Sequence, residues 1–268
     1  MNLYPAAAYL RHLLTARSTA GHGVHSPYVF DFLTKVVMNK TDLNIVSQVE
    51  SLRYAMLSDT RRITVTDLGA GSVTMAGGER SVAEIARTAA VPAKEAGLLS
   101  RIVKSKEHGA RSNGQGIILE LGTSLGISTL ALALAAPENR VITVEGCPAL
   151  AAIARENLQK YTASNAEVLA MEFSAAIERL QNEGLSVSFA FIDGNHRGSA
   201  LKEYVSRIAS MGEEMIIVAD DIRLTKEMFL AWRAVESSGI AAATMETLRL
   251  GILFIRHGIT PGRYRIRY

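Results

Sequence analysis

Residues 117–131, IILELGTSLGISTLA, constrain the fold more than any other segment of the chain. The first five residues are mostly apolar and favour a buried parallel strand. Gly122 and Gly126 then allow a tight turn and the close approach of a ligand to the backbone. A helical pattern follows at once, and the free N–H groups of a first helical turn favour a bound carboxylate or phosphate. The segment therefore predicts a cradle for a nucleotide cofactor, with an ordinary strand, turn and helix as the alternative.

Acidic residues stand at or near the carboxyl ends of four predicted strands. Glu120 lies in the first, and Glu145 ends the apolar run 141–144. Glu145 is about as far beyond the glycine turn as the acid that binds both ribose hydroxyls in mononucleotide folds. Asp193 and Asp220 each follow a later apolar run. Because the carboxyl ends of parallel strands meet at one edge of an open sheet, where ligands bind, these acids predict a single site.

Strands and helical patterns alternate as far as residue 221, which predicts an α/β fold with a mostly parallel sheet. Two last strands, at about 241–247 and 251–256, are separated by a very short connection. So short a connection favours an antiparallel hairpin over a crossover. The sheet is therefore expected to run parallel until a final reversed strand.

The first part of the chain has a different pattern, dominated by helical periodicity. We expect a helical N-terminal extension or lid over residues 1–110 and a cofactor-binding domain over residues 111–268. The segment VTDLGAGS, residues 65–72, offers a second glycine turn after an apolar run. No strand ending in an acid follows it, so we expect a loop or lid there. The N-terminal helical patterns cover residues 6–14, 29–37 and 43–57.

Composition limits the classes of partner. A chain of 268 residues with 48% hydrophobic content can bury one sizeable core, and no segment has the roughly 18 to 20 unbroken apolar residues of a membrane span. The net charge is only +3, and the basic tail HGITPGRYRIRY alternates tyrosine and isoleucine with arginine. This alternation favours a half-buried edge strand over an RNA-contacting strand, so nucleic acid is not the expected partner. Cys147 is the only cysteine, which predicts a reducing, cytoplasmic location.

Three motifs carry a family resemblance: LELGTSLGIST, VITVEG and FIDGNH. They resemble the first, second and fourth strand motifs of class I S-adenosylmethionine-dependent methyltransferases, nearest to the catechol-type O-methyltransferase branch. The resemblance covers roughly residues 116–257. Three other segments, HGVHSPYVFDFLTKV, DLGAGS and DDIRLTKEMFLAW, are similar to a bacterial group of methyltransferase-like proteins of unassigned substrate. The resemblance implies a Rossmann-like, mostly parallel seven-stranded sheet with the last strand antiparallel, and S-adenosylmethionine as the cofactor.

The resemblance also implies roles for individual residues. Gly122 and Gly126 would pass close to the methionine and ribose portions of the cofactor, and Glu145 would bind the ribose hydroxyls. Glu120 would orient the amino group or the turn, and Ser128 would meet the carboxylate. Residues just after the third strand would recognise adenine. The complete set of expected cofactor-binding residues is Glu120, Gly122, Thr123, Ser124, Gly126, Ser128, Glu145, Glu172, Phe173 and Asp193.

Two catalytic arrangements fit the motifs around the fourth and fifth strands. In the first, Asp193, Asp220 and Asp221 bind a divalent cation such as Mg²⁺, which orients the acceptor hydroxyl and lowers its pKa. Asp221 replaces an asparagine of the catechol-type enzymes, and His196 replaces their catalytic lysine. In the second, no metal binds and His196 accepts the proton, with Asp193 beside it. His196 could also be a loop histidine that caps the next helix.

The expected activity is O-methylation of a small hydroxylated molecule. An RNA or protein methyltransferase is an alternative, although the fourth strand lacks the Asn/Asp-Pro-Pro-Tyr motif of enzymes that methylate exocyclic amines. A nicotinamide-dependent oxidoreductase is a second alternative, but residues 122–126 do not have the Gly-x-Gly-x-x-Gly spacing. A non-catalytic S-adenosylmethionine-binding protein is the third. The acceptor and a homo-oligomeric state stay open.

Overall fold

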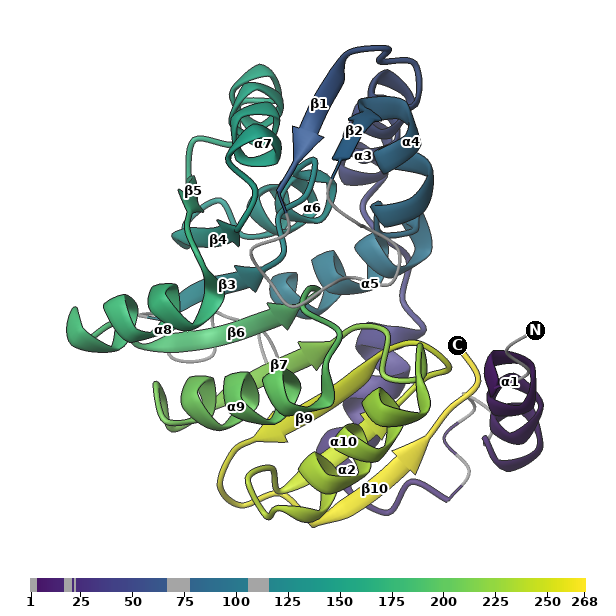
Figure 1. Ribbon diagram of the computed structural model, residues 1–268. Coiled ribbons are helices and arrows are strands. Elements are labelled where there is room, and N and C mark those ends of the chain that lie inside the picture. Colours follow the sequence, from purple (N-terminus) through teal and green to yellow (C-terminus); the bar gives the residue numbers. More distant parts are fainter. Residues whose placement is uncertain (1–3, 17–20, 22, 67–77, 106–115) are drawn as a thin grey trace.

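The computed structural model describes residues 4–16, 21, 23–66, 78–105 and 116–268. An eight-stranded sheet forms its centre, with helices on both faces (Figure 1). The strands are β3 (Ile117–Leu121), β4 (Val141–Glu145), β5 (Ala166–Ala170), β6 (Val187–Ile192), β7 (Met215–Ala219), β8 (Ala243–Glu246), β9 (Gly251–Ile255) and β10 (Gly262–Arg265). Their order is β10-β8-β9-β7-β6-β3-β4-β5.

The predicted α/β class, the mostly parallel sheet and the reversed strand at about 251–256 are confirmed, but the sheet has eight strands rather than seven. Strand β9 is the reversed strand, and it lies between β7 and β8. The additional strand is β10, which pairs parallel to β8 at the edge of the sheet. It forms because the alternating tail buries Tyr264 and Ile266, as the edge-strand prediction required.

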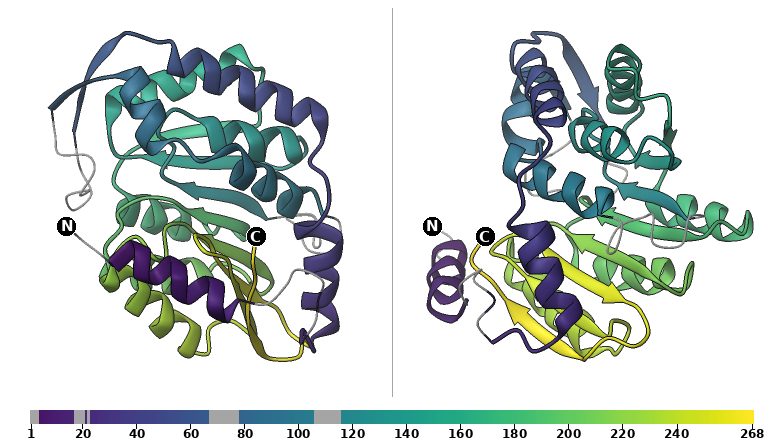
Figure 2. Two further views of the ribbon diagram at one scale, coloured as in Figure 1. Left: turned by 90° about the vertical axis from the view of Figure 1, so that its right-hand side faces the viewer. Right: turned by 180° about the vertical axis from the view of Figure 1, so that it is seen from behind.

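Two hydrophobic cores lie on opposite faces of the sheet, because successive residues of a strand point to opposite sides. Ile118 of β3 belongs to one core, whereas Leu119 and Leu121 belong to the other. Helices α8 (Phe173–Asn182), α9 (Gly198–Ala209) and α10 (Lys226–Ser237) cover the second face. Helices α6 (Ile127–Ala135) and α7 (Pro148–Lys160) cover the first face together with N-terminal helices (Figure 2).

The N-terminal part is helical where periodicity predicted it and also contains a hairpin that was not predicted. The hairpin pairs β1 (Arg62–Val65) with β2 (Gly78–Ser81). Most of the expected loop 65–72 lies outside the described residues. Of the expected loop, only Val65, the last residue of β1, and Thr66 are described. The helices are α1 (Tyr4–Thr15), α2 (Pro27–Asp31), the π-helical turn η1 (Phe32–Val37), α3 (Leu43–Leu57), α4 (Val82–Ala89) and α5 (Ala93–Lys104).

Helix α1 is bound to the last strand at the edge of the sheet. The His12 Nε2 atom hydrogen bonds to the Ile266 carbonyl at 3.1 Å. Arg265 Nη1 donates to Thr15 Oγ1 at 2.8 Å, and Arg267 Nη2 donates to the Leu13 carbonyl at 2.7 Å. Helix α1 therefore lies beside the C-terminal segment of the chain (Figures 1 and 2).

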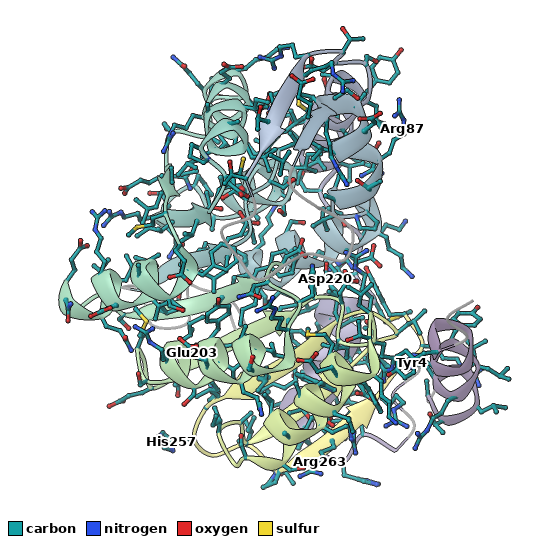
Figure 3. All side chains as sticks on the ribbon, viewed as in Figure 1. Tyr4, Arg87, Glu203, Asp220, His257 and Arg263 are labelled. Atoms are coloured by element: carbon teal, nitrogen blue, oxygen red, sulfur yellow. The ribbon has the colours of Figure 1, made fainter. Side chains whose placement is uncertain are left out.

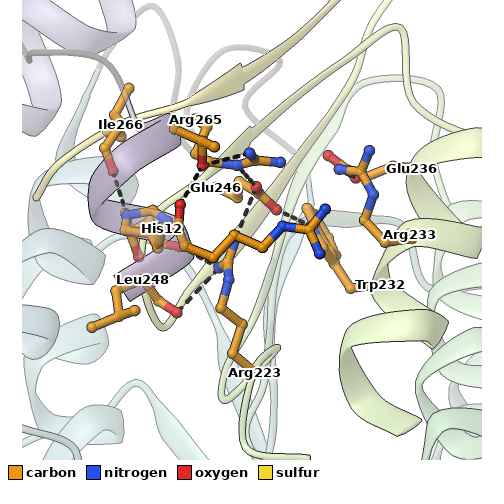
Figure 4. Close-up of polar contacts among 12 residues, drawn as sticks. His12, Arg223, Trp232, Arg233, Glu236, Glu246, Leu248, Arg265 and Ile266 are labelled. Carbon is orange, nitrogen blue, oxygen red and sulfur yellow. Dashed lines mark hydrogen bonds and ion pairs between the residues drawn. The ribbon is translucent and has the colours of Figure 1, made fainter. Parts of the chain in front are cut away.

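A buried carboxylate organises this edge of the molecule (Figure 4). Glu246 of β8 accepts hydrogen bonds from Trp232 Nε1 at 2.7 Å and from Arg265 Nε, and Arg223 Nη2 lies 2.8 Å away. Burial by itself raises the pKa of Glu246, but the charges of Arg223 and Arg265 outweigh it and the pKa is lowered. The ionised carboxylate thus joins strands β8 and β10 to helix α10. Within the described ranges, no helix has the length and apolar character needed to span a membrane.

Candidate functional site

A cavity of about 230 Å³ opens at the carboxyl ends of β3, β4 and β6. Loops after these strands form most of its wall, and Val65, Thr66, Thr88 and Ala89 of the N-terminal part complete it. The predicted edge of the sheet is therefore the place where a cavity forms. The expected site residues that line it are Gly122, Ser124, Glu145, Glu172, Phe173, Asp193, His196 and Asp221.

The turn after β3 depends on a glycine because the end of β6 lies directly against it. Gly122 has a φ of 107°, and a Cβ atom built there would lie 1.9 Å from the Asp193 carbonyl oxygen. The Asp193 N–H donates to the Leu121 carbonyl at 2.8 Å, which fixes the two strand ends together. Gly126, with a φ of 80°, begins helix α6 and does not line the cavity. Because Gly122 has no side chain, the peptide backbone is accessible at the cavity wall, where a ligand can contact it.

Glu145 lies at the end of β4 with both carboxylate oxygens fixed by backbone groups. One oxygen accepts from Ser124 N–H at 2.8 Å and the other from Cys147 N–H at 2.9 Å. Burial raises the pKa of Glu145, although these hydrogen bonds act in the opposite direction. The remaining lone pairs of the carboxylate can accept hydrogen bonds from a ligand in the cavity.

Glu120, Thr123 and Ser128 do not line the cavity. Glu120 is fully buried, and its Oε2 accepts from Thr129 and Thr143 hydroxyls at 2.5 and 2.6 Å. Burial raises the pKa of Glu120, and hydrogen bonds from the hydroxyls of Ser128, Thr129 and Thr143 oppose it. The buried side chains of Glu120, Thr123 and Ser128 therefore brace the turn from inside the protein.

Glu172 and Phe173 lie at the start of α8 and both line the cavity. Glu172 caps the helix by accepting from the Ala175 N–H at 3.0 Å. A Cβ atom on Gly194 would lie 2.7 Å from the Phe173 ring, so only glycine lets this ring cover the turn after β6. Tyr204 packs edge-on against Phe173 with ring centroids 6.0 Å apart. The structure thereby presents an aromatic wall beside an acid, as an adenine site requires.

Asn195 and Tyr204 line the cavity although sequence reasoning did not select them. Asn195 Nδ2 donates to the Tyr204 hydroxyl at 2.8 Å. Buried side-chain atoms without a hydrogen-bond partner among the described residues include Asn195 Oδ1, Ser124 Oγ and Glu120 Oε1. Such atoms are costly unless a ligand or water satisfies them. Tyr204 lies on helix α9, beyond the FIDGNH motif, and no local pattern marks it.

The three aspartates expected to hold a metal are bound differently. Asp220, labelled in Figure 3, is fully buried and does not line the cavity. Arg249 binds it through two hydrogen bonds, Nε to Oδ1 at 2.5 Å and Nη2 to Oδ2 at 2.6 Å. Among the described residues, no group of three or more His, Cys, Asp or Glu residues is arranged to hold a metal ion. In this structure Asp220 forms a carboxylate–guanidinium pair with Arg249, a residue of the β8–β9 connection.

Asp193, Asp221 and His196 nevertheless face the same cavity. Asp221 Oδ1 lies 3.3 Å from Arg249 Nε, and Asp221 Oδ2 lies 4.0 Å from His196 Nε2. Burial raises the pKa of Asp193 well above its usual range, the charges of Asp220 and Asp221 raise it further, and Arg249 opposes them. An imidazole beside a carboxylate can accept a proton from a ligand in this part of the cavity.

Comparison with known proteins supports the same reading of the fold. A family model described as a methyltransferase domain matches residues 119–222. The O-methyltransferase TomG from Streptomyces achromogenes, solved with SAM, is 19% identical with a TM-score of 0.52, covering 63% of this chain and 82% of its own. An O-methyltransferase from Bacillus cereus, solved with SAH, is 17% identical with a TM-score of 0.53, covering 85% and 96%. No curated protein matches. At these identities the likeness establishes the fold, and the expected resemblance to class I methyltransferases is confirmed.

Proposed function

From the methyltransferase domain that this chain carries, and from its class I fold, we propose that the protein transfers a methyl group from S-adenosylmethionine to an oxygen of a small hydroxylated molecule. The observation that carries the proposal is the cavity at the carboxyl ends of β3, β4 and β6, where Gly122, Glu145 and Phe173 meet. The glycine turn would contact the methionine portion of the cofactor, the acid would bind its ribose, and the aromatic ring would pack against its adenine. The neighbours solved with SAM and SAH support the choice of cofactor.

The residues present fit this cofactor. The carboxylate of Glu145 would accept hydrogen bonds from both ribose hydroxyls, a charge-assisted arrangement. Phe173 would pack against the adenine ring, with Glu172 beside its amino group. Ser124 Oγ and Asn195 Oδ1 are buried, line the cavity and have no partner among the described residues, so a ligand would satisfy them.

Glu120, Thr123 and Ser128 would act on the cofactor through the turn rather than by direct contact. Their side chains are buried, and Glu120 accepts hydrogen bonds from the hydroxyls of Thr129 and Thr143. This bracing would hold the backbone of Gly122 and Gly126 in place for the methionine portion. Preorganised backbone donors of this kind require no rearrangement when the ligand binds.

We assign proton transfer to His196. S-adenosylmethionine, when bound, supplies a methyl carbon on a sulfonium, and its carbon–sulfur bond breaks with the electron pair going to sulfur as the acceptor oxygen bonds to that carbon. His196 would accept the hydroxyl proton of the acceptor, and Asp221, 4.0 Å away, would stabilise the resulting imidazolium. Asp193 would lie at the junction between the cofactor and the acceptor, since it lines the cavity and contacts the glycine turn.

We also propose that residues 1–110 form an extension that shapes the acceptor side, with residues 111–268 as the cofactor-binding domain. Val65, Thr66, Thr88 and Ala89 support this division of labour, because they bring the N-terminal part to the cavity wall. These side chains are small or apolar, which suits a compact organic acceptor better than a nucleic acid. A single cysteine, buried at the start of α7, fits the cytoplasmic location that we propose.

Calorimetry and turnover test the proposal separately. Titration with S-adenosylmethionine, S-adenosylhomocysteine and NAD is expected to show binding of the first two alone. Methyl transfer to a library of hydroxylated compounds is expected to depend on His196, so that His196→Gln lowers kcat while cofactor affinity is kept. Binding of NAD alone would refute the cofactor assignment. Cofactor binding with transfer only to RNA or protein, or with no transfer to any acceptor class, would refute the small-molecule assignment.

A further inference from the structure

Arg249 is placed at the acceptor side of the cavity by backbone hydrogen bonds. It lies in the short connection between β8 and β9, and its carbonyl accepts from the Ile222 N–H at 3.1 Å. Its own N–H donates to Thr247 Oγ1 at 3.2 Å, and the same hydroxyl accepts from Leu250 N–H at 2.8 Å. The β8–β9 connection is therefore joined to the loop after β7, and the Arg249 side chain starts from a fixed position.

The guanidinium of Arg249 binds both carboxylates at the end of β7. Its two hydrogen bonds to Asp220 form the parallel fork that makes arginine–carboxylate pairs strong. The same Nε atom lies 3.3 Å from Asp221 Oδ1. The Asp220 side chain is fully buried, whereas that of Arg249 is 32% exposed and lines the cavity. Buried carboxylates need such a partner, since removal of one member leaves an uncompensated charge.

The guanidinium opposes a divalent cation at the same carboxylates. Mg²⁺ binds carboxylate oxygens at about 2.0 to 2.1 Å in a strict octahedral geometry. Both oxygens of Asp220 already accept hydrogen bonds from the guanidinium, with N···O distances of 2.5 and 2.6 Å, and its positive charge repels a second cation there. The hydrogen bonds to Asp220 use Nε and Nη2, and Nη1 makes none to any described residue.

We propose that Arg249 is the resident cation of the acceptor side: it takes the place that a divalent metal would have on Asp220 and Asp221, and it directs Nη1 at the acceptor oxygen. The second half of this inference rests on the proposed methyl transfer, whereas the first half does not. A guanidinium can neutralise and orient a developing oxyanion through hydrogen bonds. It lacks the Lewis acidity of a metal, so the proton of the acceptor hydroxyl has to go to a base, and His196 lies next to Asp221 for this purpose.

Binding of Mn²⁺, followed by the loss of its free-ion signal in electron paramagnetic resonance, tests the first half without any methyl acceptor. The wild type is expected to leave millimolar Mn²⁺ free. Arg249→Ala is expected to bind Mn²⁺ at least about tenfold more tightly, because hard carboxylate oxygens are then available. Adding Asp220→Asn to Arg249→Ala should remove this gain. The matched control is Arg140→Ala, which breaks an exposed ion pair with Glu167 at the other side of the sheet.

Two outcomes would overturn the proposal. In the first, the wild type binds Mn²⁺ as tightly as Arg249→Ala does. In the second, Arg249→Ala gains no affinity for Mn²⁺ although its circular dichroism and its cofactor binding are normal. If Arg249→Ala unfolds, Arg249→Gln provides a side chain of similar length without the charge, and the same two outcomes apply. Turnover tests the second half: chelator should leave wild-type methyl transfer unchanged, and Arg249→Lys should raise KM for the acceptor more than KM for the cofactor. Failure of the proposed function would appear instead as absent S-adenosylmethionine binding in every protein, with the Mn²⁺ results unaffected.

Discussion

Replacement of Glu145 should separate cofactor binding from stability. If Glu145 accepts hydrogen bonds from the ribose hydroxyls, Glu145→Ala removes a charge-assisted pair and should weaken S-adenosylmethionine binding by about 2 kcal/mol or more, which is about 30-fold in Kd. The alanine variant also leaves the N–H groups of Ser124 and Cys147 without their present acceptor. Part of its loss would therefore come from a displaced turn, and a second variant is needed to isolate the ribose contact.

Glu145→Gln is that variant, because it keeps one acceptor oxygen and nearly the same volume. Burial raises the pKa of Glu145 in the folded protein. An acid whose folded pKa is raised stabilises the fold only while protonated, and this contribution is lost as the pH rises through the folded value. At neutral pH, Glu145→Gln removes the cost of a buried charge but also takes the acceptor from one backbone N–H. Because these two effects oppose each other, the thermal midpoint should change little while cofactor affinity falls.

Titration calorimetry with S-adenosylhomocysteine, beside a thermal unfolding curve for each variant, measures both quantities. Glu178→Ala, a change at an exposed position of α8 away from the cavity, serves as a control for both. Unaltered affinity in both Glu145 variants would remove this residue from the site and refute the reasoning.

The other predictions concern stability and its dependence on pH. Gly122→Ala should lower the free energy of unfolding by roughly 2 kcal/mol or more, measured by urea titration, because the new Cβ would collide with the Asp193 carbonyl at a positive φ; an unchanged midpoint would contradict the turn geometry. Trp232→Ala, at a fully buried ring, should cost about 3 to 5 kcal/mol in the same titration, and a smaller loss would show that the site collapses around the gap. Because the pKa of Glu246 is lowered in the folded protein, its ionised form contributes stability above the unfolded value of about 4.3, and this is lost as the pH falls through the folded value. The difference in unfolding free energy between wild type and Glu246→Gln should therefore shrink from pH 7 to pH 3, and a constant difference would argue against the ion cluster.

Elements with strong local patterns could be predicted from the sequence. The apolar run of β3, the glycine turn and the start of α6 are encoded within a few consecutive residues, and the structure has them where they were expected. The short connection at 248–250 predicted the antiparallel pairing of β8 and β9. The β1–β2 hairpin was missed because each strand has only four residues and β2, GERS, contains no apolar residue.

The site was predictable only as far as local chemistry reaches. The position of Glu145 follows from the length of one β-α-β unit, and it does line the cavity. Glu120 carries the same chemistry, but its burial depends on which side of the strand faces the neighbouring helix. The role of Arg249 could not be predicted from adjacent residues in the sequence, because its partner Asp220 follows a different strand.

The packing of α1 against the final strand has a consequence for the order in which the elements of this protein fold. The hydrogen bond between His12 and Ile266 joins positions 254 residues apart. Ribosomes deliver the chain from its amino end, so the partners of α1 emerge only after the sheet strands β3 to β9 have been synthesised. Contacts of such long sequence separation form slowly. Helix α1 is thus made well before its partner strand and is among the last of these elements to reach its place.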